Sequence, residues 1–154
     1  MTTPLSAETI AIVKATAPVL QEHGLAITKR MYARLFVNED IKVLFHQAAQ
    51  ESGEQPKRLA AAILAYAQNI DKLQNLTAPV QRMVARHVET GVREEHYPYV
   101  ANALLPAIRD VLGDAATDEV LAAWGEAYWF LAHLLIGQEK VAYAEIAAEA
   151  GEAA

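Results

Sequence analysis

The sequence of 154 residues contains no cysteine, which excludes several kinds of site. No disulfide framework, thiolate nucleophile, or cysteine-ligated zinc or iron–sulfur centre can form, so a metal would need histidine, carboxylate or tyrosine ligands. Basic residues are also scarce, because 13 Lys and Arg stand against 19 Asp and Glu, for a formal net charge of -6. Nucleic-acid affinity comes mostly from clustered Lys and Arg, so we expect no nucleic-acid partner.

Long apolar runs are missing as well. No stretch of the sequence reaches the roughly 18 uninterrupted apolar residues that predict a membrane-spanning helix. The first residues, "MTTPLSAETI", lack the basic region and apolar run of a secretory signal. We therefore expect no membrane span and a cytoplasmic location. The length is typical of one domain that buries a core and can enclose a small molecule.

The sequence does contain a strong helical periodicity. Apolar residues recur at steps of three and four, and no alternating strand pattern is present. Capping and turn residues predict helices from Ser6 to Gly24, from Ile27 to the break "VNED", from Pro56 to the break "LQNLTAP", from about Val80 onward, from Pro98 to Leu112, and, very long, from Thr117 onward. The predicted fold is all-α, with a domain over residues 1–148 and an Ala/Glu tail over 149–154 that should fray.

Two polar side chains are predicted to point into this core. His87 shares a helix face with Val80 and Val84. On the last helix, Glu139 and Tyr128 point in directions that differ by about 20° around the helix axis. An unpaired buried charge costs several kcal/mol, so Glu139 needs donors, and His87 and Tyr97 are the candidates. Two interpretations stay open from these residues alone. His87 is either a core histidine with satisfied hydrogen bonds, or a metal ligand whose second ring nitrogen is held by the carboxylate.

Several segments carry a resemblance to a known family. They are "ESGEQPK" at 51–57, "AQNI" at 67–70, "HYP" at 96–98, "VLGDAATDE" at 111–119, "AW" at 123–124 and "EAY" at 126–128. In this order and spacing, the region from about residue 5 to 148 resembles the bacterial haemoglobins, both the single-domain haemoglobins and the globin domain of flavohaemoglobins. The resemblance implies a globin fold with a haem pocket between distal and proximal helices.

The resemblance also implies the residues of that pocket. On the proximal side, His87 would bind the iron of haem b, with Tyr97 and Glu139 hydrogen-bonded to it and Arg86 beside a haem propionate. On the distal side, Tyr32 and Gln55 would hydrogen-bond a gas ligand. The residues implied as catalytic are Tyr32, Gln55, Tyr97 and Glu139, and those implied to contact the haem are Phe45, Leu59, Arg86, His87, Tyr97, Val100 and Tyr128.

The implied ligands are dioxygen, nitric oxide and carbon monoxide, and two functions compete. In the first, the oxy-ferrous protein oxidises nitric oxide to nitrate. An external flavin reductase would then be needed, because flavohaemoglobins continue into FAD and NAD domains whereas this sequence stops at Ala154. In the second, the protein stores or delivers oxygen without catalytic turnover. A haem-free sensor globin is disfavoured because the residues of both haem faces are present. The sequence leaves the oligomeric state open, with a homodimer as one alternative.

Overall fold

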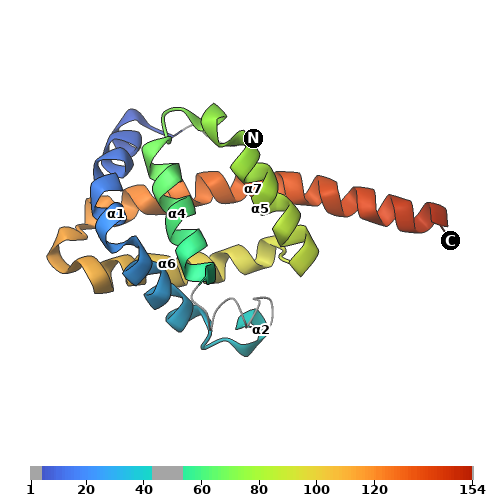
Figure 1. Ribbon diagram of the computed structural model, residues 1–154, viewed down its shortest axis with the longest axis horizontal. Helices are drawn as coiled ribbons and strands as arrows, with labels where there is room; N and C mark the ends of the chain where they lie inside the picture. The colour runs from blue at the N-terminus through green and yellow to red at the C-terminus, as the bar shows by residue number, and fades with distance from the viewer. Residues whose placement is uncertain (1–4, 43–53, 154) are drawn as a thin grey trace.

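The computed structural model describes residues 5–42 and 54–153 (Figure 1). All regular elements in these two ranges are helical. The α-helices are α1 (Ala7–Leu35), α2 (Glu39–Lys42), α4 (Glu54–Gln68), α5 (Thr77–Thr90), α6 (Tyr97–Leu112) and α7 (Asp118–Ala153), and short 3₁₀ turns η1 (Leu73–Leu76), η2 (Glu94–His96) and η3 (Gly113–Ala115) join them. The predicted all-α architecture is confirmed.

The first helix corrects one prediction. Ser6 caps α1 as expected, because its Oγ accepts the backbone N–H of Thr9 at 3.1 Å. The predicted helix end at Gly24 is wrong, since α1 continues through this residue to Leu35. Gly24 is buried, and a Cβ added there would lie 3.6 Å from Cβ of Ala60 on α4. This is an ordinary contact distance, so Gly24 packs on α4 inside a continuous helix, where a glycine costs roughly 0.5–1 kcal/mol relative to alanine.

Other predicted helix boundaries agree with the structure. Pro56 lies in the first turn of α4 and Pro98 in the first turn of α6, positions where the missing proline N–H costs little. Thr117 caps α7, because its Oγ1 accepts the N–H of Val120 at 3.2 Å. Helix α5 begins at Thr77, slightly before the predicted start near Val80.

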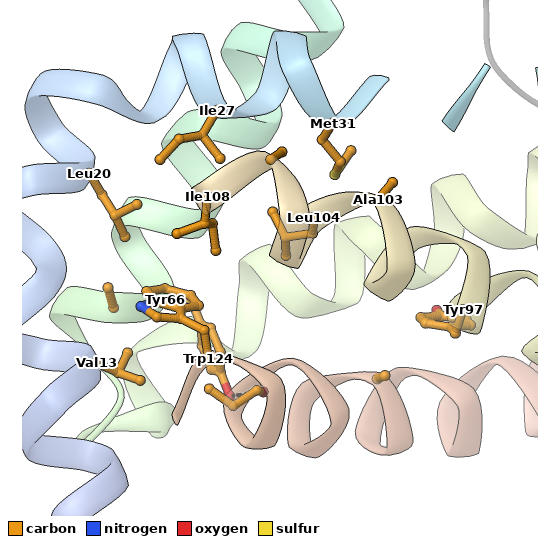
Figure 2. Packing of buried hydrophobic residues seen from close by; sticks show 14 of the residues in the cluster. Val13, Leu20, Ile27, Met31, Tyr66, Tyr97, Ala103, Leu104, Ile108 and Trp124 are labelled. Carbon is orange, nitrogen blue, oxygen red and sulfur yellow. Dashed lines mark hydrogen bonds between the residues drawn. The ribbon is translucent and has the colours of Figure 1, made fainter. Parts of the chain in front are cut away.

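The core lies where α1 packs against α4 and α6 while α7 crosses behind them (Figure 1). Figure 2 shows Met31 from α1 and Leu104 from α6 on one side of this core, and Trp124 from α7 on the other. The Tyr66 hydroxyl of α4 donates to the Ala127 carbonyl of α7 at 2.8 Å. Helix α5 packs mainly on α7 and also contacts η1.

Helix α7 is very long, as predicted. Its C-terminal part projects beyond the other helices in Figure 1, and residues 149–151 are exposed helix, so the fraying of this tail stays a prediction. By length and composition alone, Asp118–Gly151 is apolar enough to cross a membrane. Core helices pass the same test, and α7 buries Trp124 and Leu135 inside the domain. The absence of a membrane span therefore stays a prediction.

Candidate functional site

His87 lies near the C-terminal end of α5, in a turn that several hydrogen bonds hold in place. Gly91 ends the helix with a left-handed φ of 82°, a conformation that favours glycine. The Val92 N–H then donates to the His87 carbonyl at 2.8 Å, and Thr90 Oγ1 donates to the Arg86 carbonyl at 2.9 Å. These bonds satisfy carbonyl groups that the end of a helix would otherwise leave unpaired.

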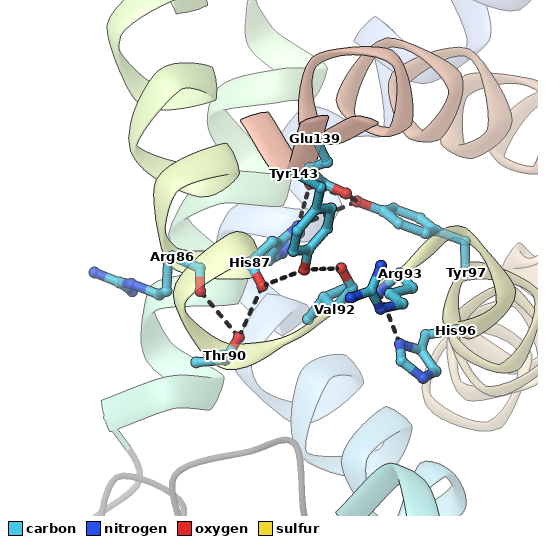
Figure 3. Close-up of polar contacts among 9 residues, drawn as sticks. All are labelled: Arg86, His87, Thr90, Val92, Arg93, His96, Tyr97, Glu139 and Tyr143. Atoms are coloured by element: carbon cyan, nitrogen blue, oxygen red, sulfur yellow. Dashed lines mark hydrogen bonds and ion pairs between the residues drawn. The ribbon is translucent and has the colours of Figure 1, made fainter. Parts of the chain in front are cut away.

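His87, Tyr97 and Glu139 meet although they come from α5, α6 and α7 (Figure 3). Nδ1 of His87 lies 2.7 Å from Oε2 of Glu139 and 3.1 Å from the hydroxyl of Tyr97. The Tyr97 hydroxyl donates to Glu139, with distances of 2.8 Å to Oε1 and 2.9 Å to Oε2. We call these three residues the proximal cluster.

The carboxylate in this cluster is well compensated. Glu139 is only 2% exposed and Tyr97 6%, so both polar groups depend on each other and on His87. Burial and the hydrogen bond to Glu139 raise the pKa of Tyr97 well above its ordinary value. Tyr97 therefore stays protonated and donates. The other donor is the Nδ1–H of His87, which leaves the lone pair of the imidazole on Nε2.

This geometry leaves His87 able to act as a metal ligand. The side chain of His87 is 29% exposed. Within the residues that the structure describes, Nδ1 has hydrogen-bond partners and Nε2 has none. A buried structural histidine usually has both nitrogens satisfied, whereas a metal-bound imidazole gives its second N–H to a carboxylate or carbonyl. His87 can thus hold an iron through Nε2, and Glu139 would fix its tautomer.

Further residues support the cluster or lie beside it. The Tyr128 hydroxyl donates to the Tyr97 carbonyl at 2.6 Å, and burial raises the pKa of Tyr128, so this donor also stays protonated. Val100 on α6 is half-buried against the core. Arg86 is exposed, and its side chain points away from the proximal cluster in Figure 3. Contact of these side chains with a haem stays a prediction.

The predicted distal residues come from α1 and α4. Tyr32 is 5% exposed, and its ring centroid lies 5.4 Å from that of Phe36. Leu59 is half-buried on α4, and Gln55 lies in the first turn of α4, although its side chain is outside the described residues. Phe45 is outside them altogether. Because the Gln55 side chain is outside the described residues, the shared role of Tyr32 and Gln55 stays a prediction.

One residue joins the two distal helices and escaped the sequence analysis. Thr28, fully buried one turn before Tyr32, donates through Oγ1 to the Pro56 carbonyl at 3.0 Å. This contact ties α1 to the first turn of α4, where Gln55 lies. A buried threonine on an apolar helix face was the available signal, because its hydroxyl needs a partner.

Two more polar residues near the cluster have structural contacts that the sequence did not reveal. Nδ1 of His96 accepts the backbone N–H of Arg93 at 2.9 Å, which caps η2 and accounts for this histidine. The Tyr143 hydroxyl donates to the Val92 carbonyl at 2.6 Å. Tyr143 follows Glu139 by one helical turn, so the spacing on α7 was a usable signal.

Comparison with known sequences gives close relatives. The family model for globins matches residues 29–135. The chain is 52% identical to a flavohemoprotein of Xylella fastidiosa over 141 residues, which cover 92% of this chain and 36% of that protein. It is 51% identical to a flavohemoprotein of Bordetella pertussis over 148 residues, which cover 96% of this chain and 37% of that protein. The chain thus spans little more than a third of the length of these relatives.

Solved structures agree with this assignment. An engineered carbene transferase from Rhodothermus marinus, assigned as a nitric oxide dioxygenase, has a TM-score of 0.88 and 43% identity, with coverage of 93% of this chain and 99% of that one. A bacterial globin from Campylobacter jejuni has a TM-score of 0.83 and 40% identity, with coverage of 90% and 99%. The resemblance to bacterial haemoglobins and the predicted globin fold are therefore confirmed, and the chain belongs to the globin family.

Proposed function

We propose that this protein binds one non-covalent b-type haem through His87 and uses dioxygen to oxidise nitric oxide to nitrate. The overall conversion, NO + O₂ + e⁻ → NO₃⁻, needs one electron per turnover, and we propose a separate flavin reductase as its source. When bound, the haem supplies an iron that binds dioxygen and changes its oxidation state by one electron. The proximal cluster is the observation that carries the proposal, because a buried carboxylate behind the ligand is suited to redox work.

The proximal residues tune the ligand. Glu139 accepts the Nδ1–H of His87 and so increases the electron density on Nε2. A more basic ligand and a nearby negative charge both favour the higher oxidation state of an iron that it holds. Tyr97 shares the same carboxylate and limits how strongly Glu139 acts on His87, because its hydroxyl donates to both carboxylate oxygens.

The distal residues would act on dioxygen. Tyr32 projects from α1 into the core beside Phe36, and its hydroxyl and the Gln55 amide are the proposed donors to dioxygen. Hydrogen bonds to a partly anionic oxygen are stronger than those between neutral groups. Leu59, half-buried on α4, would keep the space near the ligand small and apolar. The similarity to the Xylella fastidiosa flavohemoprotein and to the Rhodothermus marinus structure supports the proposed oxidation of nitric oxide.

Removing the Tyr32 hydroxyl tests the distal side. We expect Tyr32→Phe to release dioxygen several-fold faster, because one lost hydrogen bond is worth about 0.5–1.5 kcal/mol and somewhat more toward a partly anionic oxygen. Stopped-flow measurement of oxygen dissociation checks this. Tyr99→Phe is the matched control, since Tyr99 is 47% exposed on α6. A wild-type rate in Tyr32→Phe would remove Tyr32 from the distal site.

Oxygen storage or delivery is the second candidate function. The similarity to the Campylobacter jejuni structure supports it, because that chain is described as a bacterial globin with no enzyme activity in its name. The same hydrogen bonds that would support nitric oxide oxidation would also retain dioxygen in a store. Repeated turnover therefore distinguishes the two candidates, while oxygen affinity does not.

Nitric oxide consumption decides between them. We expect the oxygenated protein with NADH alone to consume about one equivalent of nitric oxide, since re-reduction of the haem is then missing. Adding a flavin reductase with NADH should convert this single event into sustained nitrate formation, recorded with a nitric oxide electrode. The reductase without the globin is the control. Failure to turn over even with reductase would favour a carrier or store, and sustained turnover without reductase would contradict the proposed electron source.

A further inference from the structure

Helix α7 holds the region of His87 at two places. Glu139 contacts Nδ1 of the imidazole at 2.7 Å, and one helical turn later the Tyr143 hydroxyl donates to the Val92 carbonyl at 2.6 Å (Figure 3). The same hydroxyl lies 3.5 Å from the His87 carbonyl. One contact therefore holds the side chain of the histidine, and the other holds the main chain next to it.

The main-chain contact connects closely to His87. The N–H of Val92 donates to the His87 carbonyl at 2.8 Å, so the residue that Tyr143 holds is itself bonded to the backbone of the histidine. The Arg93 guanidinium covers the Tyr143 ring at 4.4 Å from its centroid, which keeps the ring in place. A movement of this turn would move the Cα of His87 relative to Glu139, which belongs to a different helix.

We infer that Tyr143 is a positioning residue of the proximal cluster: its hydrogen bond to Val92 sets the orientation in which His87 meets Glu139. The inference rests on the proposed role of His87 as the haem ligand. A hydrogen bond weakens steeply when its angle or length departs from the optimum, so a small rotation of the turn would weaken the 2.7 Å contact. Loss of the Tyr143 hydroxyl should therefore act on the iron in the same direction as loss of the Glu139 charge, and more weakly.

A cavity beside the cluster makes the choice of substitution important. It has a volume of about 160 Å³ and is lined by Arg93, Glu139 and Tyr143 among others, including Glu94 and Glu95 of η2. Truncation of Tyr143 to alanine would enlarge this cavity and let water reach Glu139. That variant would therefore combine the loss of the hydrogen bond to Val92 with a change in the solvation of Glu139. Tyr143→Phe keeps the ring under Arg93 and removes only the hydroxyl, so it isolates the hydrogen bond.

The test compares Tyr143→Phe with wild type in the full chain loaded with haem. We expect the ferric/ferrous midpoint potential to rise by less than in Glu139→Gln, and the iron–histidine stretching frequency in the resonance Raman spectrum to fall. Tyr143→Phe also removes the hydrogen-bond donor to the Val92 carbonyl. In the haem-free variant we therefore expect faster hydrogen exchange of the backbone amides around Val92 than in the haem-free wild type. Arg93→Met, which removes the cation over the ring and leaves the hydroxyl, should give smaller changes in the same direction.

Tyr66→Phe is the matched control. It also removes a hydrogen bond from a tyrosine hydroxyl to a backbone carbonyl, at 2.8 Å to Ala127, and it also loosens a contact with α7. Both variants should lose stability, measured as a lower free energy of unfolding, because each removes one hydrogen bond. Only Tyr143→Phe should move the potential and the Raman band. Equal stability loss with neither shift would make Tyr143 a structural contact and overturn the inference.

A double substitution separates this inference from the proposed function. If Tyr143 acts through Glu139, Tyr143→Phe should change the potential little when Glu139→Gln is already present, because coupled residues are not additive. A full additional shift in that background would mean that Tyr143 acts by another route, and would overturn the inference. If Glu139→Gln itself moves neither potential nor Raman band, the proximal assignment under the proposed function fails first.

Discussion

His87→Ala is expected to abolish stable haem binding. His87 is the proposed ligand to the iron, and within the described residues its Nε2 has no hydrogen-bond partner that would give it another purpose. The haem would then be held only by apolar contacts and its propionates, without a coordinate bond. We expect purified His87→Ala to contain a small fraction of the wild-type haem, measured by absorbance after reduction and by the carbon monoxide difference spectrum.

The control for this loss is His23→Ala, because the side chain of His23 is 43% exposed and lies 3.8 Å from that of the neighbouring Glu22. A second variant, His87→Gly, leaves space for free imidazole at the same site. Added imidazole should bind the iron in place of the His87 side chain, and so restore haem binding and a spectrum like that of the wild type. Normal haem content with an unchanged ferrous spectrum in His87→Ala would show that another residue holds the iron.

Glu139→Gln is expected to raise the reduction potential of the haem. Glutamine keeps the shape of the side chain and removes the negative charge that accepts the Nδ1–H of His87. Without this charge His87 is a weaker electron donor, and the ferric state loses more stabilisation than the ferrous state. We expect a rise on the order of 59 mV, which corresponds to a tenfold change in the one-electron equilibrium.

Spectroelectrochemical titration measures this shift. Glu126→Gln is the control on the same helix, because Glu126 accepts a hydrogen bond from Thr9 on α1 and has no contact with His87. It should leave the potential unchanged. A potential that stays constant or falls in Glu139→Gln would contradict the role assigned to the proximal cluster, even if the protein still binds haem through His87.

The local elements of this protein could be predicted because their causes are local. Ser6 and Thr117 cap helices through hydroxyl groups that reach backbone N–H groups within the same turn. Pro56 and Pro98 mark the first turns of α4 and α6 for an equally local reason. The inward faces that carry His87 and Glu139 follow from the period of an α-helix, since a face is defined by spacing along one segment.

Gly24 shows where a local rule stops. A glycine after a helical run usually ends the helix, yet α1 passes through this residue. Gly24 is buried where α1 packs on α4, with Ala60 beside it. No pattern within residues 7–35 contains that information. Whether a glycine ends a helix or allows two helices to pack is decided by a neighbour distant in sequence.

The sequence by itself determined that the protein is all-α, where most helices begin, and that a histidine and a carboxylate face the core. The tertiary structure decided which groups meet. His87 and Glu139 are separated by 52 residues, and only the packing of α5 on α7 brings them to 2.7 Å. The hold of Tyr143 on Val92 has the same origin. Helix period is a property of neighbouring residues, whereas the distance between two helices depends on the packing of the whole core.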